Sequence, residues 1–221
     1  MKCDLHVHTS YSYDSTASPK EMVEAAIKKG VNCLAVTDHS ETKGASEAIE
    51  YAKGKSILII PGIEIKSKEG DILGLNIKEV IPDGLSAKES IKKIKEAGGM
   101  AVIPHPFGWF CSFKGNLKEI SKEIDGIEVL NASSVFGPGN KKALDFAQRF
   151  NLPFTAGSDA HEPNMVGKVY LEVPGNNLSI EEILNQIKNR NAKTEGSKVN
   201  FFEKIIAHLG RNIAKIKNYA R

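Results

Sequence analysis

Short apolar segments alternate along the chain with segments whose apolar residues recur at helical spacing. The first kind predicts strands at Lys2–His8, Asn32–Thr37, Ile57–Ile65, Met100–Pro104, Ile124–Leu130, Pro153–Ala156 and Lys168–Val173. The second predicts helices at Pro19–Lys29, Gly44–Ala52, Ala87–Ala97, Asn140–Phe150 and Ser179–Asn189. Repeated strand–helix units build a parallel sheet with helical crossovers. The expected fold is α/β, with seven strands closed into a distorted (β/α) barrel, although a doubly wound sheet has the same order of elements.

Two further segments complete the expected fold. Asp71–Ile77 predicts an extra short strand that forms a hairpin with Ile63–Lys66. Beyond Asn200, an apolar stripe at helical spacing predicts an amphipathic helix; its members are Phe202, Ile205, Ile206, Leu209, Ile213 and Ile216. We therefore expect a barrel over residues 1–197 and a basic C-terminal helix over residues 198–221. This helix would pack on the barrel, form a dimer contact or present a basic face to a polyanion.

Composition narrows the class of protein. Of the 221 residues, 41% are hydrophobic and 26% are charged, as in an ordinary globular domain. Residues 198–221 hold six basic side chains and one acidic one, so their net charge is +5, whereas the whole chain carries only +3. No apolar run is long enough for a membrane span, and the polar N-terminal residues do not resemble a signal peptide. Three cysteines without a Cys-x-x-Cys spacing fit a reducing compartment, so we expect a cytoplasmic protein.

The histidines show where chemistry is expected. Five of the six lie at or just beyond the predicted carboxyl ends of strands, and three carboxylates accompany them. Because strand ends meet at one rim of a barrel, we expect a common pocket there. The predicted metal ligands are His6, His8, Asp14, His39, Glu64, His105, Asp159 and His161. Imidazole and carboxylate donors suit Zn²⁺, Mn²⁺ or Fe²⁺, and eight donors exceed what one ion needs, so two or three divalent ions are expected.

Each motif also has a plain structural interpretation when taken alone. His6 and His8 flank a valine and fit a partly buried strand, and the residues around Asp159 fit a turn that caps a helix. What favours a metal site is the shared position of nearly all the histidines at strand ends. His208, in the predicted tail helix, is the exception and has no assigned role.

Five motifs in order resemble the polymerase and histidinol phosphatase (PHP) family. They are Asp4-Leu5-His6-Val7-His8-Thr9, Thr37-Asp38-His39-Ser40, Pro61-Gly62-Ile63-Glu64, His105-Pro106 and Gly157-Ser158-Asp159-Ala160-His161. The resemblance implies a distorted barrel and a di- or trinuclear metal site that hydrolyses phosphoesters. It implies a first ion on His6, His8, Glu64 and Asp159, and a second on Asp14, His39 and His161. Glu64 would bridge these ions and, with His105, contribute to a third.

The chain departs from the family pattern between Glu64 and His105, where many relatives supply another histidine and this sequence has none. Asp71 is the nearest substitute, and Glu128 is a second candidate. Asp38 and Asp4 are expected to orient ligating imidazoles from behind. Lys43 and Lys168 are the candidate cations for the substrate phosphate.

The resemblance implies a metal-dependent phosphoesterase in which a hydroxide bridging two ions attacks phosphorus. The expected partner is a phosphorylated small molecule or nucleotide, including a nucleoside bisphosphate, a short oligonucleotide or a phosphorylated metabolite, and no membrane. Two other functions stay open. An amidohydrolase-type barrel that cleaves C–N bonds also begins with His-x-His, and a non-catalytic metal-binding scaffold would keep the same ligands.

Overall fold

Strands and helices alternate along the chain in the computed structural model, which describes residues 1–108, 112–134, 138–196, 212 and 215–216. The strands are β1 (Lys2–Val7), β2 (Cys33–Val36), β3 (Leu58–Lys66), β4 (Asp71–Leu75), β5 (Met100–Ile103), β6 (Gly126–Asn131), β7 (Phe154–Gly157), β8 (Val169–Glu172) and β9 (Lys193–Gly196). The helices are α1 (Pro19–Lys28), α2 (Lys43–Ala52), α3 (Ala87–Glu96), α4 (Leu117–Ile120), α5 (Gly139–Phe150) and α6 (Ile180–Lys188).

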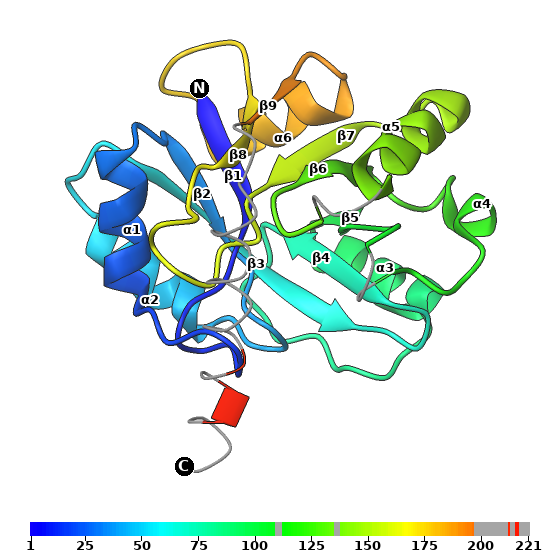
Figure 1. The fold of residues 1–221 in the computed structure, drawn as a ribbon, viewed down its shortest axis with the longest axis horizontal. Helices are drawn as coiled ribbons and strands as arrows, with labels where there is room; N and C mark the ends of the chain where they lie inside the picture. Colours follow the sequence, from blue (N-terminus) through cyan, green and yellow to red (C-terminus); the bar gives the residue numbers. More distant parts are fainter. Residues whose placement is uncertain (109–111, 135–137, 197–211, 213–214, 217–221) are drawn as a thin grey trace.

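The strands form one sheet in the order β7-β6-β5-β4-β3-β2-β1-β8-β9. The sheet curls until the end of β7 meets β1: the Asp159 N–H donates to the His6 carbonyl at 2.8 Å, and the His8 N–H donates to the Ala160 carbonyl at 2.8 Å. A Cβ atom on Gly157 would lie only 2.4 Å from that of His6, so this junction requires glycine. The predicted barrel is confirmed, and it is nearly closed (Figure 1).

The expectation of seven strands is wrong in number, because the described part of the chain contains nine. The sheet is also mixed rather than parallel. β4 pairs antiparallel with both β3 and β5, and β8 pairs antiparallel with β1 and β9. The hairpin predicted for Asp71–Ile77 does form, whereas β9 was not expected because its short polar sequence lacks an apolar alternation.

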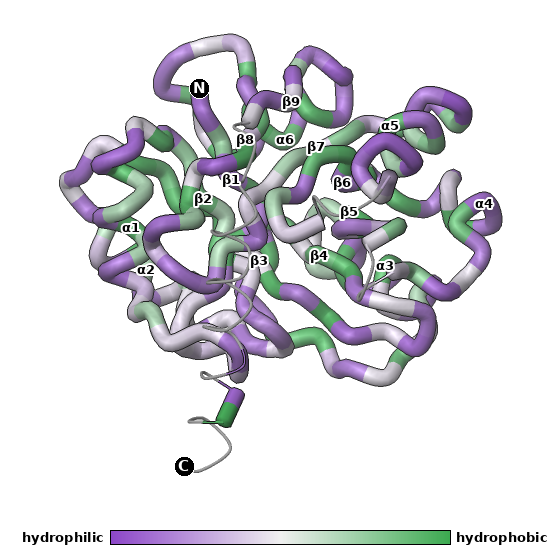
Figure 2. Tube along the Cα trace, in the orientation of Figure 1, coloured by the Kyte–Doolittle hydropathy of each residue, from purple (hydrophilic) through white to green (hydrophobic). Residues whose placement is uncertain are grey.

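Helix boundaries follow local capping chemistry. Ser18, Ser86 and Ser179 each begin a helix with a capping box, in which the serine accepts from a backbone N–H three residues later and the glutamate there reaches back. Helices α1 and α2 cover the β1–β3 side of the sheet, and α3 and α5 cover the β4–β6 side (Figure 1). Two hydrophobic clusters lie beneath them, and Figure 2 shows hydrophobic residues along the central strands. This packing holds the strand ends that carry the histidines.

The predicted C-terminal helix lies mostly outside the described residues, which include only residues 212, 215 and 216 of that segment. The domain boundary at residue 197 stays a prediction for the same reason. No helix in the described ranges combines the length and the apolar character that crossing a bilayer requires.

Candidate metal centre

Two histidines at the end of β1 point their ring nitrogens at each other. His6 and His8 are fully buried, and their Nε2 atoms lie 3.0 Å apart. Residues two apart on a strand share a face, so the sequence spacing itself brings the rings together.

Neighbouring side chains fix which nitrogen of each ring carries hydrogen. The His6 Nδ1 faces the Glu128 Oε1 at 3.3 Å, and a carboxylate only accepts. The His8 Nδ1 lies 3.1 Å from the Ser12 Oγ, which donates its own hydrogen to the Asp38 Oδ1 at 2.8 Å. Both rings therefore keep hydrogen on Nδ1 when neutral, and two Nε2 lone pairs face each other. That arrangement calls for a cation between them.

Nearby carboxylates raise the pKa values of both histidines. Burial lowers the pKa of His6, but the charges of Asp159, Glu128 and Glu64 outweigh burial and raise this pKa well above its ordinary value. The pKa of His8 is also raised, because hydrogen bonds to Asp159 and Glu64 outweigh burial and the nearby His39.

Glu64 on β3 contacts four of the histidines. Its Oε2 is 3.2 Å from the His8 Nε2, 3.1 Å from the His39 Nδ1 and 3.5 Å from the His6 Nε2, and its Oε1 is 3.3 Å from the His105 Nε2. Burial alone would raise the pKa of Glu64, but the charges of His39 and His6 hold it well below its ordinary value. A buried carboxylate with one oxygen on each side suits a bridge between metal ions.

A second pair of facing donors joins the loop after β1 to the segment after β7. The Asp14 Oδ1 and the His161 Nε2 are buried, lie 3.2 Å apart and have no hydrogen-bond partner among the described residues. The His161 Nδ1 donates to the Asp159 carbonyl at 3.0 Å, so its Nε2 presents a lone pair. Burial and the nearby His8 lower the pKa of His161, which favours the neutral ring. Two acceptors in contact fit a cation again.

Asp159 and His105 complete the cluster with unusual backbone conformations. The Asp159 Oδ1 lies 3.5 Å from the His8 Nε2 and 3.7 Å from the His6 Nε2. Asp159 and His105 have φ angles of 50° and 29°, which non-glycine residues rarely adopt. Strained conformations of this kind gather at functional sites, where the surrounding structure holds them in place.

Three overlapping sets of donor atoms result, and the atoms of each set lie within 4.8 Å of one another. The sets are His6, His8 and Asp159; His6, Glu64 and His105; and His8, His39 and His161. These sets contain seven of the eight predicted ligands, and Asp14 joins them beside His161, so the structure brings all eight together; the facing lone pairs fit divalent cations. The donor chemistry, imidazole with carboxylate, is that of Zn²⁺, Mn²⁺ or Fe²⁺ sites.

Asp38 and Asp4 hold residues next to the candidate ligands, and their predicted role in orienting imidazoles stays a prediction. Asp38 accepts from the Thr9 N–H at 2.6 Å and the Ser12 hydroxyl at 2.8 Å, and thereby holds the partner of His8. Asp4 accepts from the N–H and the hydroxyl of Ser158, at 2.8 and 2.6 Å, which fixes the segment before Asp159. Burial raises the pKa of Asp4 to about 6, although these hydrogen bonds act in the opposite direction.

The two candidates for an extra ligand differ in position. Glu128 faces the Nδ1 of His6, on the side of the ring away from the facing Nε2 atoms, so it orients the ring. Its Oε2 accepts from the His105 N–H and the Asn131 side chain, both at 2.9 Å. Burial and the nearby Glu64 charge raise the pKa of Asp71, the other candidate. Its role as a ligand stays a prediction.

The two candidate phosphate cations lie at the start of a helix and of a strand. Lys43 is the first residue of α2; its side chain is 74% exposed, and its ammonium lies 3.1 Å from the Glu41 carboxylate. Lys168 immediately precedes β8, and its carbonyl lies beside Gly196 of β9. The printed sequence gave no signal for Tyr13, whose ring stacks on His39, except that it directly precedes Asp14.

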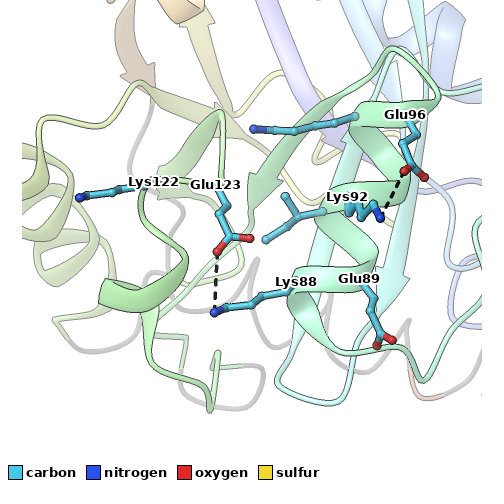
Figure 3. Close-up of a pocket in the computed structure, with 8 residues that line it drawn as sticks. Lys88, Glu89, Lys92, Glu96, Lys122 and Glu123 are labelled. Carbon is cyan, nitrogen blue, oxygen red and sulfur yellow. Dashed lines mark ion pairs between the residues drawn. The ribbon is translucent and has the colours of Figure 1, made fainter.

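A surface hollow of about 710 Å³ lies elsewhere, between α3 and the turn at Lys122 and Glu123 (Figure 3). Lys88 pairs with Glu123 at 3.8 Å, and Lys92 pairs with Glu96 at 3.7 Å. The lining residues include no histidine and are mostly lysines and glutamates, so this hollow is separate from the metal centre.

Two regions of the chain match known protein families. Residues 4–134 match the PHP domain, and residues 137–192 match a region described as PHP-associated. The chain belongs to the PHP domain family. This PHP protein is accordingly a metal-dependent phosphoric ester hydrolase, the enzyme class that the motifs predict.

Relatives of this PHP protein come from several organisms. An uncharacterized protein of Methanocaldococcus jannaschii is 39% identical over 155 residues, which cover 66% of this chain and 90% of the relative. A 5′-3′ exoribonuclease of Haemophilus influenzae is 39% identical over 99 residues, which cover 43% of this chain and 36% of the exoribonuclease. A solved two-domain protein of Bacteroides vulgatus, which contains a predicted PHP-like metal-dependent phosphoesterase, has a TM-score of 0.75 and 20% identity, covering 96% of this chain and 69% of that one. This last likeness confirms the fold.

Proposed function

We propose that this chain hydrolyses a phosphate ester of a nucleotide, nucleoside bisphosphate, short oligonucleotide or small phosphorylated metabolite at the cluster around Glu64. The observation that carries the proposal is the pair of facing, buried donor sites. The Nε2 atoms of His6 and His8 lie 3.0 Å apart, and the Asp14 Oδ1 and the His161 Nε2 lie 3.2 Å apart. When bound there, two or three divalent ions supply an activated water and charge that neutralises the phosphoryl oxygens.

The protein's own residues hold this site and do not act as a nucleophile. Glu64 lies between His8 and His39 and would contact the ions that these residues hold. Ser12 has the right position beside His8 for a serine nucleophile, but its hydroxyl donates to Asp38 and accepts from the His8 ring. A serine activated by histidine needs the opposite direction of donation. Ser12 therefore fixes the tautomer of His8.

The comparisons support a phosphoester as the substrate. The Haemophilus influenzae relative is named a 5′-3′ exoribonuclease, and this chain spans about a third of its length. A relative in Eggerthella lenta is named a phosphoribosyl 1,2-cyclic phosphate 1,2-diphosphodiesterase. Both names describe hydrolysis at a phosphate group, and they differ in the leaving group.

The test is a substrate screen on metal-free protein reloaded separately with Mn²⁺, Zn²⁺ or Fe²⁺. Mononucleotides, bisphosphates, sugar phosphates and short RNA would be compared with a cyclic amide. Asp14→Asn serves as the inactive control, because it replaces the carboxylate that faces the His161 Nε2 by an uncharged amide, which is a weaker metal ligand. We expect metal-dependent release of phosphate or nucleotides. Hydrolysis of the amide alone would favour the C–N hydrolase, and tight metal binding without turnover of any substrate would favour the scaffold.

A further inference from the structure

The metal cluster opens towards solvent beside His39. The side chain of His39 is 19% exposed, compared with 0% for His6 and His8 and 7% for His161. Tyr13 lies at this opening, with its ring stacked on that of His39 at 4.8 Å between centroids and 19° between planes. A substrate that reaches the cluster by this route passes Tyr13.

The C-terminal segment brings a cation to the same place. The Lys215 Nζ lies over the Tyr13 ring, 5.5 Å from its centroid, within the range of a cation–π contact. The loop after β1 (blue) and the short segment that contains Lys215 (red) lie next to each other in Figure 1. Tyr13 is 46% exposed although it contacts both His39 and Lys215, so its ring is not simply part of the core.

Lys215 differs in its partners from Lys43, the candidate phosphate cation on α2. The Lys43 ammonium is paired with Glu41 at 3.1 Å, and nearby Tyr11 donates to Glu47 at 3.0 Å. Among the described residues, no carboxylate lies within ion-pair distance of Lys215. The segment from residue 198 onwards also carries a net charge of +5. Lys215 is therefore the described ammonium at this opening whose charge is left for an external anion.

We propose that Lys215, positioned by the ring of Tyr13, binds a second phosphate group of the substrate while the metal cluster takes the phosphate that is cleaved. The inference rests on the proposed function and narrows its substrate class. It selects phosphoesters with two phosphates on one molecule, such as nucleoside bisphosphates and short oligonucleotides, over monophosphates. Tyr13 acts through Lys215 and is a positioning residue.

The test compares adenosine 3′,5′-bisphosphate with adenosine monophosphate, which lacks the second phosphate. Lys215→Met is expected to lower kcat/KM for the bisphosphate about fivefold, the upper range for an exposed ion pair, through KM rather than kcat. The monophosphate should change less than twofold. Tyr13→Leu should lower kcat/KM for the bisphosphate to the same extent. Tyr13→Phe, which keeps the ring, should have the wild-type kcat/KM. In 1 M NaCl, Lys215→Met and the wild type should have the same kcat/KM for the bisphosphate, since charges are then screened within about 3 Å.

Lys122→Met, in the separate hollow of Figure 3, is the matched control and should leave both substrates unchanged. An unchanged preference in Lys215→Met, with full activity, would overturn the role of Lys215 and leave the proposed function intact. An effect of Tyr13→Leu that Tyr13→Phe does not restore would overturn the positioning role of the ring. If the wild-type protein loaded with each metal hydrolyses neither nucleotide nor any other phosphoester, the proposed function itself fails.

Discussion

Glu128 offers the sharpest test of how the proposed metal site is built, because it is buried and contacts two candidate ligands, His6 and His105, on the side away from the facing Nε2 atoms. Its two oxygens accept from three groups: the His6 Nδ1 at 3.3 Å, and the His105 N–H and the Asn131 amide at 2.9 Å. Glu128→Gln keeps the shape but replaces one acceptor by an NH₂ group. In either orientation of the new amide, at least one N–H then faces another N–H.

The less costly orientation keeps the oxygen on His105 and Asn131 and turns the NH₂ group towards His6. His6 then prefers hydrogen on Nε2, where it faces His8 and blocks a metal ion. To bind a metal ion, His6 must move its hydrogen back to Nδ1, where it faces the new NH₂ group. This leaves a buried donor without an acceptor, which costs about 1–3 kcal/mol of free energy. Since about 1.4 kcal/mol corresponds to tenfold in affinity, we expect metal binding to weaken about 10- to 100-fold.

The assay is competition between the protein and a chromophoric chelator for Zn²⁺ and Mn²⁺, together with thermal unfolding of the metal-free protein. Glu172→Gln, on an exposed position of β8, is the matched control and should bind metal like the wild type. Weaker metal binding by Glu128→Gln with an intact fold would support the reasoning. If this variant bound both metals with wild-type affinity, the tautomer argument would be refuted.

Three further predictions follow from the same network. His39→Ala should stay folded by circular dichroism but lose a bound ion and its turnover; full turnover in a metal-controlled assay would contradict the ligand assignment. Gly44→Ala should reduce the free energy of unfolding in urea by about 1–3 kcal/mol, because its Cβ would lie 2.0 Å from the Asp38 Oδ2; unchanged stability would show that Asp38 moves freely. Burial opposes protonation of His39 and His105, yet Glu64 raises their pKa values to about 10 and about 9. The ion pairs of His39 and His105 with Glu64 therefore stabilise the fold fully below the unfolded histidine pKa of 6.5, and this stabilisation is lost as pH rises through 9 to 10. The Tm of the metal-free protein should fall between pH 7 and 10. A Tm that stays level over this range would contradict the pairing of these histidines with Glu64.

The sequence predicts which candidate ligands lie together because their positions depend on local rules. His6 and His8 share a face of a strand, and His39 and His105 follow strand ends that apolar patterning locates. These rules need no knowledge of distant contacts. They therefore identify which residues gather at the rim, although the distances between them come only from the fold.

Other features depend on contacts that no local pattern records. Glu128 contacts His6 across 122 residues of sequence, so its place behind the ring becomes visible only when β6 and β1 come together. β9 escaped prediction because a strand that pairs only along its backbone needs no apolar alternation. The contact of Tyr13 with Lys215 likewise joins the two ends of the chain.

The reversed direction of β4 has a consequence for how this protein can change. Because β4 runs opposite to β3, with Lys66 opposite Asp71, the four-residue connection Ser67–Gly70 lies at the end of β3 that follows Glu64. Residues inserted into this turn would leave the pairing of β3 with β4 in place and lengthen the chain at this end of the sheet. A longer turn between β3 and β4 could therefore change substrate selection while the sheet keeps its order of strands.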